Sequence, residues 1–347
     1  MLQRYSSPGI ESGGRYPYAY ARVCVMRAAL LGRQDYDRLL RMGLSEVIGF
    51  LESSQYKAEI DALAVRFSGV SLMEQALNLN LANTYQKLRR FSGPSLQRVL
   101  DVYLKRRDRD NFKAVLRGIY TSSSEDDVMN VLVPYSVSAE RLRSVFRRQS
   151  VEEALRDSGL PAAQVKVAVD RFRETGSLAE VENVIDSEYR RAIVAGMQGM
   201  GSSLFREFLA EEMLIAALIK VLRYRREGMD KRDMQKAVAD AEPMVRRLSE
   251  LGLAEILSAL ENSRFGEHVR QGVKEFREKE TLIYVETGLY KYLLRKALSL
   301  HRRKPLLADS IVGYVFAKEI EIRNLRLIMK ARQLGMAEGF IEEQLVV

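Results

Sequence analysis

The sequence of 347 residues contains no tryptophan, one cysteine and two histidines. A single cysteine, Cys24, excludes an intramolecular disulfide and a zinc site built from cysteines, and it makes a reducing compartment the simplest setting. His268 and His301 have no acidic or cysteine neighbours at the spacing of metal ligands. We therefore expect neither a metal nor a cofactor.

Long hydrophobic runs are also missing. The longest stretch without a charged residue, 192–205, has 14 residues and is rich in glycine, whereas a helix that spans a bilayer needs about 20 apolar residues. The sequence thus predicts no transmembrane helix and no signal peptide.

Signatures of catalysis are absent as well. The glycines of Gly196–Gly201 lack the order of a phosphate-binding loop and are interpreted as a flexible turn between helices. Cys24 lies on an apolar helical stripe, which favours a core position over a nucleophile. Glu211 and Glu212 are adjacent, so on a helix they point about 100° apart and cannot form an acid–base dyad. We expect no catalytic residue.

The net charge is +9, which predicts attraction to nucleic acid, anionic lipid head groups or an acidic protein surface. Because 46 acidic residues are interleaved with the bases, we interpret the basic clusters as solvated helix faces. No nucleic-acid readout module is recognisable, so nucleic acid is not an expected partner. The clusters are Arg89 and Arg90, Lys105–Arg109, Arg141–Arg148, Arg223–Arg226 and Arg302–Lys304.

One helical pattern occurs three times and is the most informative feature of the chain. It reads RDNFKAVLR around Asn111, AALIKVLR around Ala217 and RNLRLIMK around Asn324, so 106 residues separate the first two copies and 107 the last two. Each copy places apolar residues on one helix face and ends on a base that suits the negative helix C-terminus. The closing bases are Arg117, Arg223 and Lys330.

A second block repeats upstream in the same order. Residues 40–56 align without gaps with residues 249–265, with Gly43 matching Gly252, and residues 150–158 keep the apolar spacing in the middle copy. Two blocks with nearly the same period predict three related domains of ordinary size. The predicted boundaries are a flexible leader at 1–15 and helical repeat domains at 16–122, 123–229 and 230–347.

Local signals predict helices throughout. Pro17 fits the first turn of a helix that begins near Tyr16, and Gly228 and Gly335 follow equivalent blocks as left-handed C-terminal glycines. Because no alternating apolar run of five or more residues occurs, we predict an all-α protein. Capping boxes predict further helix starts at Ser122 with Glu125, Ser150 with Glu153, and Ser177 with Glu180.

The repeated asparagines Asn111 and Asn324 each follow an acid by three residues, Asp108 and Glu321. The pattern favours an internal hydrogen bond that ties this helix to a neighbour, because a half-buried amide needs partners. A contact with another molecule is the alternative. The middle copy has Ala217 instead of asparagine.

With the copies aligned, the chain resembles the C subunit of the archaeal-type (A/V-type) rotary ATP synthase, the relative of the d subunit of vacuolar ATPases. The resemblance is carried by the opening YAYARVCVMRAALL, the internal DNFKAVLR and the closing segment from Tyr314 to Val347, and it covers the chain from about Arg15. The long polar leader and the middle copy without asparagine depart from the family pattern.

This resemblance implies an all-helical, funnel-like protein with three similar domains around a pseudo-threefold axis and a central cavity. It implies no active site, and a place between the central stalk, made of the D and F subunits, and the membrane ring of proteolipid subunits. The protein would be peripheral, on the cytoplasmic side of the membrane, and would couple stalk and ring in proton- or sodium-driven ATP synthesis or ATP-driven ion pumping.

Basic clusters at one end of such a funnel would assist docking to the ring, and anionic lipid head groups are a further candidate partner. From the residues alone, two alternatives stay open. One is a helical-repeat scaffold with a continuous concave side, and the other is a basic nucleic-acid-binding protein.

Overall fold

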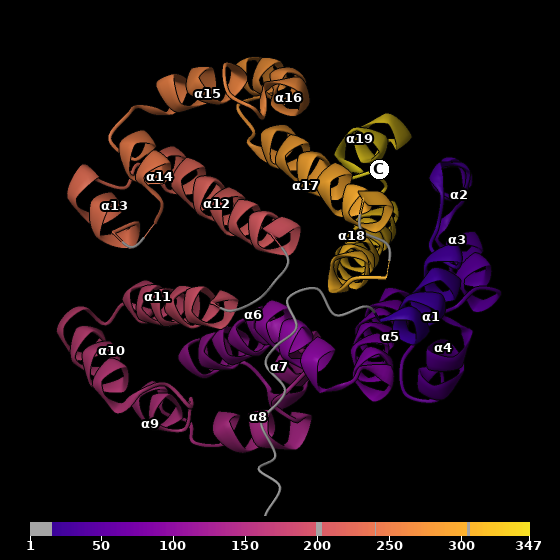
Figure 1. Cartoon of the computed structure of the whole chain (residues 1–347), viewed down its shortest axis with the longest axis horizontal. Coiled ribbons are helices and arrows are strands. Elements are labelled where there is room, and N and C mark those ends of the chain that lie inside the picture. The colour runs from indigo at the N-terminus through magenta and orange to yellow at the C-terminus, as the bar shows by residue number, and fades with distance from the viewer. Residues whose placement is uncertain (1–15, 199–202, 240, 304–305) are drawn as a thin grey trace, which may run out of the picture.

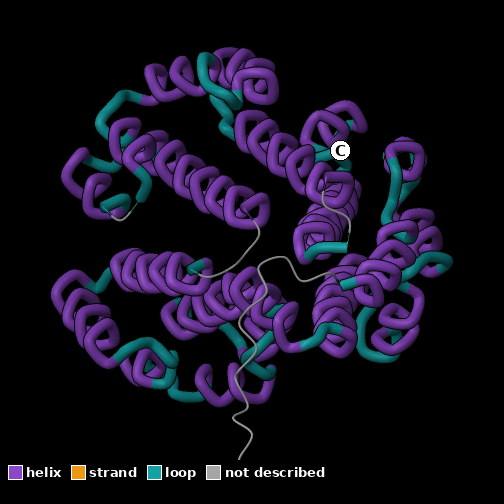
Figure 2. The backbone as a smooth tube through the Cα atoms, viewed as in Figure 1, coloured by secondary structure: helices purple, strands orange, loops and turns teal. Residues whose placement is uncertain are grey.

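A computed structural model describes residues 16–198, 203–239, 241–303 and 306–347, and every regular element in these ranges is a helix (Figure 1). Figure 2 shows the helices joined mostly by short loops. The prediction of an all-α protein is confirmed. The predicted leader and residues 199–201 of the glycine cluster lie outside the described residues. Within the described ranges, no helix combines the length and apolarity that a bilayer crossing requires.

Three pairs of long helices form the frame. In each pair a short connection joins the end of one helix to the start of the next, and the three repeated blocks lie on the second helix of each pair. The pairs are α5 (Gly69–Phe91) with α6 (Pro94–Tyr120), α11 (Leu178–Met197) with α12 (Ser203–Arg226), and α17 (Ile283–Arg303) with α18 (Ala308–Gln333).

Short helices fill the segments between the pairs and lie towards the periphery in Figure 1. Before α5 come α1 (Pro17–Ala28), α2 (Arg33–Leu39), α3 (Leu44–Glu52) and α4 (Lys57–Leu63). Between α6 and α11 come α7 (Glu125–Val131), α8 (Ala139–Phe146), α9 (Val151–Arg156) and α10 (Ala162–Thr175). The remaining ones are α13 (Lys231–Ala237), α14 (Pro243–Leu248), α15 (Leu253–Glu261), α16 (Gly266–Lys279) and α19 (Glu338–Gln344).

The two ends of the described chain meet. Helix α18 packs against α1, α3 and α5, the N–H of Tyr16 donates to the carbonyl of Leu306 at 2.6 Å, and Arg33 forms an ion pair with Glu342 at 2.8 Å. One large apolar core accordingly contains residues from both ends of the chain. A second apolar core is made of residues from the sequence range 112–185. The helices therefore close on themselves instead of forming an open array.

The helix ends confirm some local predictions and correct others. Gly228 and Gly335 have φ of 77° and 68°, the left-handed conformation expected of them. The capping box at Ser122 is wrong, because Ser122 itself is left-handed at φ 54° and α7 is capped by Ser124, whose hydroxyl accepts from the N–H of Asp127 at 3.1 Å.

The other two predicted caps are correct only in position. Ser150 and Ser177 directly precede α9 and α11, but neither side chain caps its helix. The glycines shared by the upstream repeat do cap their helices. The N–H groups of Gly43 and Gly252 each donate to a glutamate three residues later at 2.8 Å. The repeated sequence therefore encodes the same start for α3 and α15.

Candidate functional site

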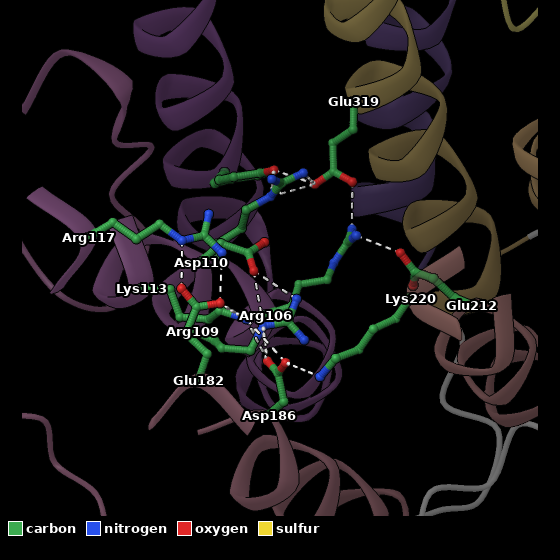
Figure 3. A network of polar contacts seen from close by, with 12 residues as sticks. Arg106, Arg109, Asp110, Lys113, Arg117, Glu182, Asp186, Glu212, Lys220 and Glu319 are labelled. Atoms are coloured by element: carbon green, nitrogen blue, oxygen red, sulfur yellow. Dashed lines mark hydrogen bonds and ion pairs between the residues drawn. The ribbon is translucent and has the colours of Figure 1, made fainter. Parts of the chain in front are cut away.

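The three long helices that carry the repeat meet at a buried charged junction (Figure 3). Arg106 of α6 lies between two carboxylates: its Nη1 is 2.5 Å from Oε1 of Glu212 on α12, and its Nη2 is 2.5 Å from Oε2 of Glu319 on α18. The exposed fractions of these side chains are 12%, 15% and 8%. We call these three residues the central junction.

Equivalent positions of the repeat form the central junction. Arg106 is separated from Glu212 by 106 residues and from Glu319 by 213, which are the spacings of Asn111 to Ala217 and to Asn324. Three equivalent positions of the repeat therefore meet at one place in the structure. In each copy the junction residue lies five positions before Asn111, Ala217 or Asn324, but its identity differs between the copies.

A second cation supports the junction from the same helix. Arg107 contacts Oε1 of Glu319 at 2.8 Å, and the hydroxyl of Tyr85 on α5 donates to the same carboxylate. The guanidinium of Arg106 also lies 4.1 Å from the ring centre of Tyr103, a cation–π contact. The interpretation of cluster Lys105–Arg109 as a solvated helix face is therefore wrong for Arg106, since α12 and α18 cover it.

The two carboxyl groups of the junction differ in pKa. Burial raises the pKa of Glu212, and the Arg106 guanidinium offsets this only in part. Burial acts in the same direction on Glu319, but Arg106 and Arg107 outweigh it and hold the pKa of Glu319 below its ordinary value. As the pH falls, Glu212 is the first of the two to take up a proton.

A further group of charges joins α6, α11 and α12. Asp186 of α11 contacts Lys113 at 3.1 Å, Lys220 at 3.6 Å and Arg109 at 3.8 Å. Burial would raise the pKa of Asp186, but these three cations lower it below its ordinary value. Lys113 also contacts Glu182 at 3.1 Å. Most of the charged side chains of Figure 3 thus link one helix to another.

The closing base of each repeated block pairs with a glutamate on the neighbouring long helix. The three pairs are Arg117 with Glu182 of α11 at 2.6 Å, Arg223 with Glu286 of α17 at 2.6 Å, and Lys330 with Glu74 of α5 at 2.8 Å. The sequence pattern related these bases only to the helix dipole and did not predict their glutamate partners. The third pair joins a helix near the C-terminus to one near the N-terminus, so the same contact recurs around the molecule.

The prediction of an internal hydrogen bond at the repeated asparagines is confirmed. Nδ2 of Asn111 donates to the carbonyl of Val133 at 2.8 Å, and the N–H of Val133 donates back to Oδ1 at 2.9 Å. Asn324 forms the same pair of bonds with Val346, at 2.8 and 3.0 Å. Each asparagine thereby holds the extended segment that follows a short helix.

The acids that precede these asparagines hold further segments. Asp108 accepts from the N–H groups of Ser136 and Val137 at 3.1 and 3.2 Å. Glu321 accepts from the N–H of Leu31 and from the Tyr56 hydroxyl, each at 2.5 Å. Glu321 thereby ties α18 to the N-terminal helices.

The other residues singled out in the sequence do not converge. Cys24 is only half-buried, so its predicted core position is not fully reached. Glu212 belongs to the central junction, while Glu211 pairs with Lys296 at 3.2 Å, so the two point to different partners as expected. His301 stacks on Tyr20 of α1. Among the described residues, no group of three His, Cys, Asp or Glu side chains could hold a metal ion.

Comparison with known proteins gives one consistent result. Residues 19–344 match the model of a family described as ATP synthase (C/AC39) subunit. The C subunit of the A-type ATP synthase of Haloferax volcanii is 32% identical, over 97% of this chain and 99% of that protein. The corresponding C subunit of Methanococcoides burtonii is 30% identical, over 100% of this chain and 99% of that protein.

Proposed function

Because this chain belongs to the family of ATP synthase (C/AC39) subunits, we propose that it is the non-catalytic C subunit of an A/V-type rotary ATP synthase. In this role it couples the central stalk, made of the D and F subunits, to the membrane ring of proteolipid subunits. It is a peripheral protein on the cytoplasmic side of the membrane, and the machine it serves makes ATP from a proton or sodium gradient or pumps ions at the expense of ATP.

The observation that carries the mechanical part of this proposal is the central junction. Arg106 binds Glu212 and Glu319 at once, so one side chain ties together the three long helices that the repeat makes equivalent. A coupling element must transmit torque without deforming, which favours packed helices cross-linked near the axis over flexible loops. The ion pairs of Arg117, Arg223 and Lys330 also link neighbouring long helices, at positions away from the central junction.

The arrangement supports a pseudo-threefold body. The same ion pair joins α6 to α11, α12 to α17 and α18 to α5, so three helix pairs surround the junction, and the N-terminal helices complete the third unit. A central cavity that receives the stalk stays part of the proposal. At the level of Arg106 the axis is occupied by side chains, so such a cavity would lie above or below this level.

The two alternatives lose support. A scaffold with a continuous concave side needs an open array, whereas here Lys330 pairs with Glu74 and Tyr16 bonds to Leu306. For the nucleic-acid alternative, Arg106 of the Lys105–Arg109 cluster cannot contact phosphate, because it lies between the carboxylates of Glu212 and Glu319.

Reconstitution tests the proposal. The purified full chain is mixed with a complex of the D and F subunits, with the detergent-solubilised ring, and with both, and the mixtures are separated by size-exclusion chromatography. We expect a complex with each and a larger one with both, and cross-linking followed by mass spectrometry should place stalk and ring on different faces. A chain that binds neither the stalk nor the ring would contradict the proposal.

A further inference from the structure

The positive charge of the chain is concentrated in three stretches. Residues 75–100, 189–206 and 287–308 contain no acid and carry four, three and six basic residues, 13 in all. Since the net charge of the whole chain is +9, the rest of the chain has a net charge of −4. Each stretch spans the connection within one pair of long helices: α5 to α6, α11 to α12, and α17 to α18.

Helix α1 brings two of these connections together. The ring of Tyr18 contacts Phe91 at the end of α5, with ring centres 6.4 Å apart, and Tyr20 stacks on His301 at the end of α17 at 5.3 Å. The N–H of Tyr16 reaches the carbonyl of Leu306, just before α18. Figure 1 shows α1 beside α5 with α18 next to it.

The third connection lies close to the same region. A Cβ added to Gly196 near the end of α11 would meet Val102 at 2.7 Å, and Val102 is two turns from the start of α6. We call this region, made of α1 and the ends of the long helices at the three connections, the basic end.

Most bases of the basic end lack carboxylate partners. Arg22 lies over the rings of Phe91 and Tyr18, 5.7 and 5.9 Å from their centres. Some exposed bases elsewhere are neutralised, for example Arg117 by Glu182 and Arg223 by Glu286. Within the described part of the chain, the following residues of the basic end are exposed and form no ion pair: Lys87, Arg89, Arg90, Arg98, Arg206, Arg302 and Arg303.

We propose that the basic end binds the anionic head groups of a membrane surface. The bases are spread over several segments, and a bilayer satisfies such a spread because its charge is distributed over a plane. Tyr18, 63% exposed, adds the aromatic side chain typical of membrane interfaces. This inference rests on the proposed function in one respect: a peripheral subunit that docks on a membrane ring holds one end near the lipid.

Vesicle binding tests the inference. The full chain is sedimented with vesicles of phosphatidylcholine alone and of phosphatidylcholine with phosphatidylglycerol, at low and at high salt. We expect binding only to the anionic vesicles and its loss near 1 M salt, where the Debye length falls to about 3 Å. Each base near an anionic surface contributes about fivefold to the binding constant, so changing Arg89, Arg90, Arg302 and Arg303 together to Gln should weaken binding by about 100-fold or more.

A matched variant removes the same charge from elsewhere. Lys231, Arg232, Arg246 and Arg247 of α13 and α14 are exposed and form no ion pair within the described residues. Changing these four to Gln lowers the net charge equally, and we expect less than about a threefold effect on vesicle binding because they lie away from the basic end. Circular dichroism melts establish that both variants fold.

The outcomes separate the two proposals. Equal binding to neutral and anionic vesicles, or equal weakening by both variants, would overturn the lipid inference. If the wild-type chain ignores anionic vesicles yet binds stalk and ring, the lipid inference falls, the proposed function stands, and the basic end is assigned to an acidic protein surface. If vesicle binding behaves as expected but stalk and ring binding both fail, the proposed function falls and the lipid inference stands.

Discussion

Replacing Arg106 with methionine tests whether the central junction holds the molecule together. Methionine fills a similar volume without charge, so the change leaves Glu212 buried with no ion-pair partner among the described residues, whereas Glu319 keeps Arg107. Removing one partner of a buried ion pair costs about 3–5 kcal/mol. Because one of the two carboxylates stays paired, we expect the lower value, about 3 kcal/mol, in the free energy of unfolding at pH 8.

The loss should depend on pH in a defined direction. Without Arg106 the burial of Glu212 is offset only by the weaker effects of Arg107 and Arg109, so its folded-state pKa rises further above the unfolded value. A folded state that binds a proton more tightly than the unfolded state gains stability as the pH falls. Urea unfolding followed by circular dichroism should therefore show a smaller difference between variant and wild type at pH 5 than at pH 8.

Two further variants sharpen the test. Arg106→Met combined with Glu212→Leu places apolar side chains at both positions and should recover much of the loss, since well-packed apolar residues often replace a buried pair without cost. Arg117→Gln removes a cation that is 59% exposed and should cost no more than about 1 kcal/mol. If Arg106→Met is no more harmful than Arg117→Gln, and equally harmful at both pH values, the central junction does not have the role assigned to it.

Three other perturbations follow from the structure. Asn324→Leu leaves the N–H and carbonyl of Val346 without partners and should lower the free energy of unfolding by about 1–3 kcal/mol in denaturant titrations; an unchanged midpoint would contradict this. Gly118→Ala should destabilise by about 1–3 kcal/mol, because its Cβ would lie 2.2 Å from a side-chain carbon, while Gly49→Ala, with open space around it, should raise the melting temperature slightly. Glu319→Gln should cost most near neutral pH and progressively less as the pH falls through the acid range, because a carboxyl group with a lowered folded-state pKa loses its contribution on protonation; a cost that is constant from pH 7 to pH 4 would refute the assigned pKa direction.

Much of the local structure could be predicted from the sequence. The helix at Pro17, the left-handed glycines 228 and 335, and the internal bonds of Asn111 and Asn324 are all present. These features depend on residues close together in the chain or on chemistry that one side chain imposes, such as the need of a buried amide for partners. The Ser122 cap failed because several serines adjoin, and the residue that caps depends on the angle at which the chain enters the helix.

The candidate site was less accessible to sequence reasoning. Arg106, Glu212 and Glu319 occupy equivalent positions of the repeat but are not the same residue in each copy. A search for identical residues between the copies therefore does not find them. The closing bases were recognised, but not their glutamates, because Glu74, Glu182 and Glu286 lie on helices whose spacing in the sequence is less regular. Charge complementarity between distant segments becomes visible only when the helices are placed side by side.

By itself, the sequence determined that this protein is helical, that its pattern recurs three times and to which family it belongs, because helical periodicity and repeated blocks are written in consecutive residues. Only the tertiary structure decided that α18 packs against α5 and α1, so that residues from both ends of the chain share one apolar core. It also decided which cations form internal ion pairs and which remain unpaired. A charge is neutralised by an opposite charge a few ångströms away in space, and such neighbours can be more than 200 residues apart in the sequence.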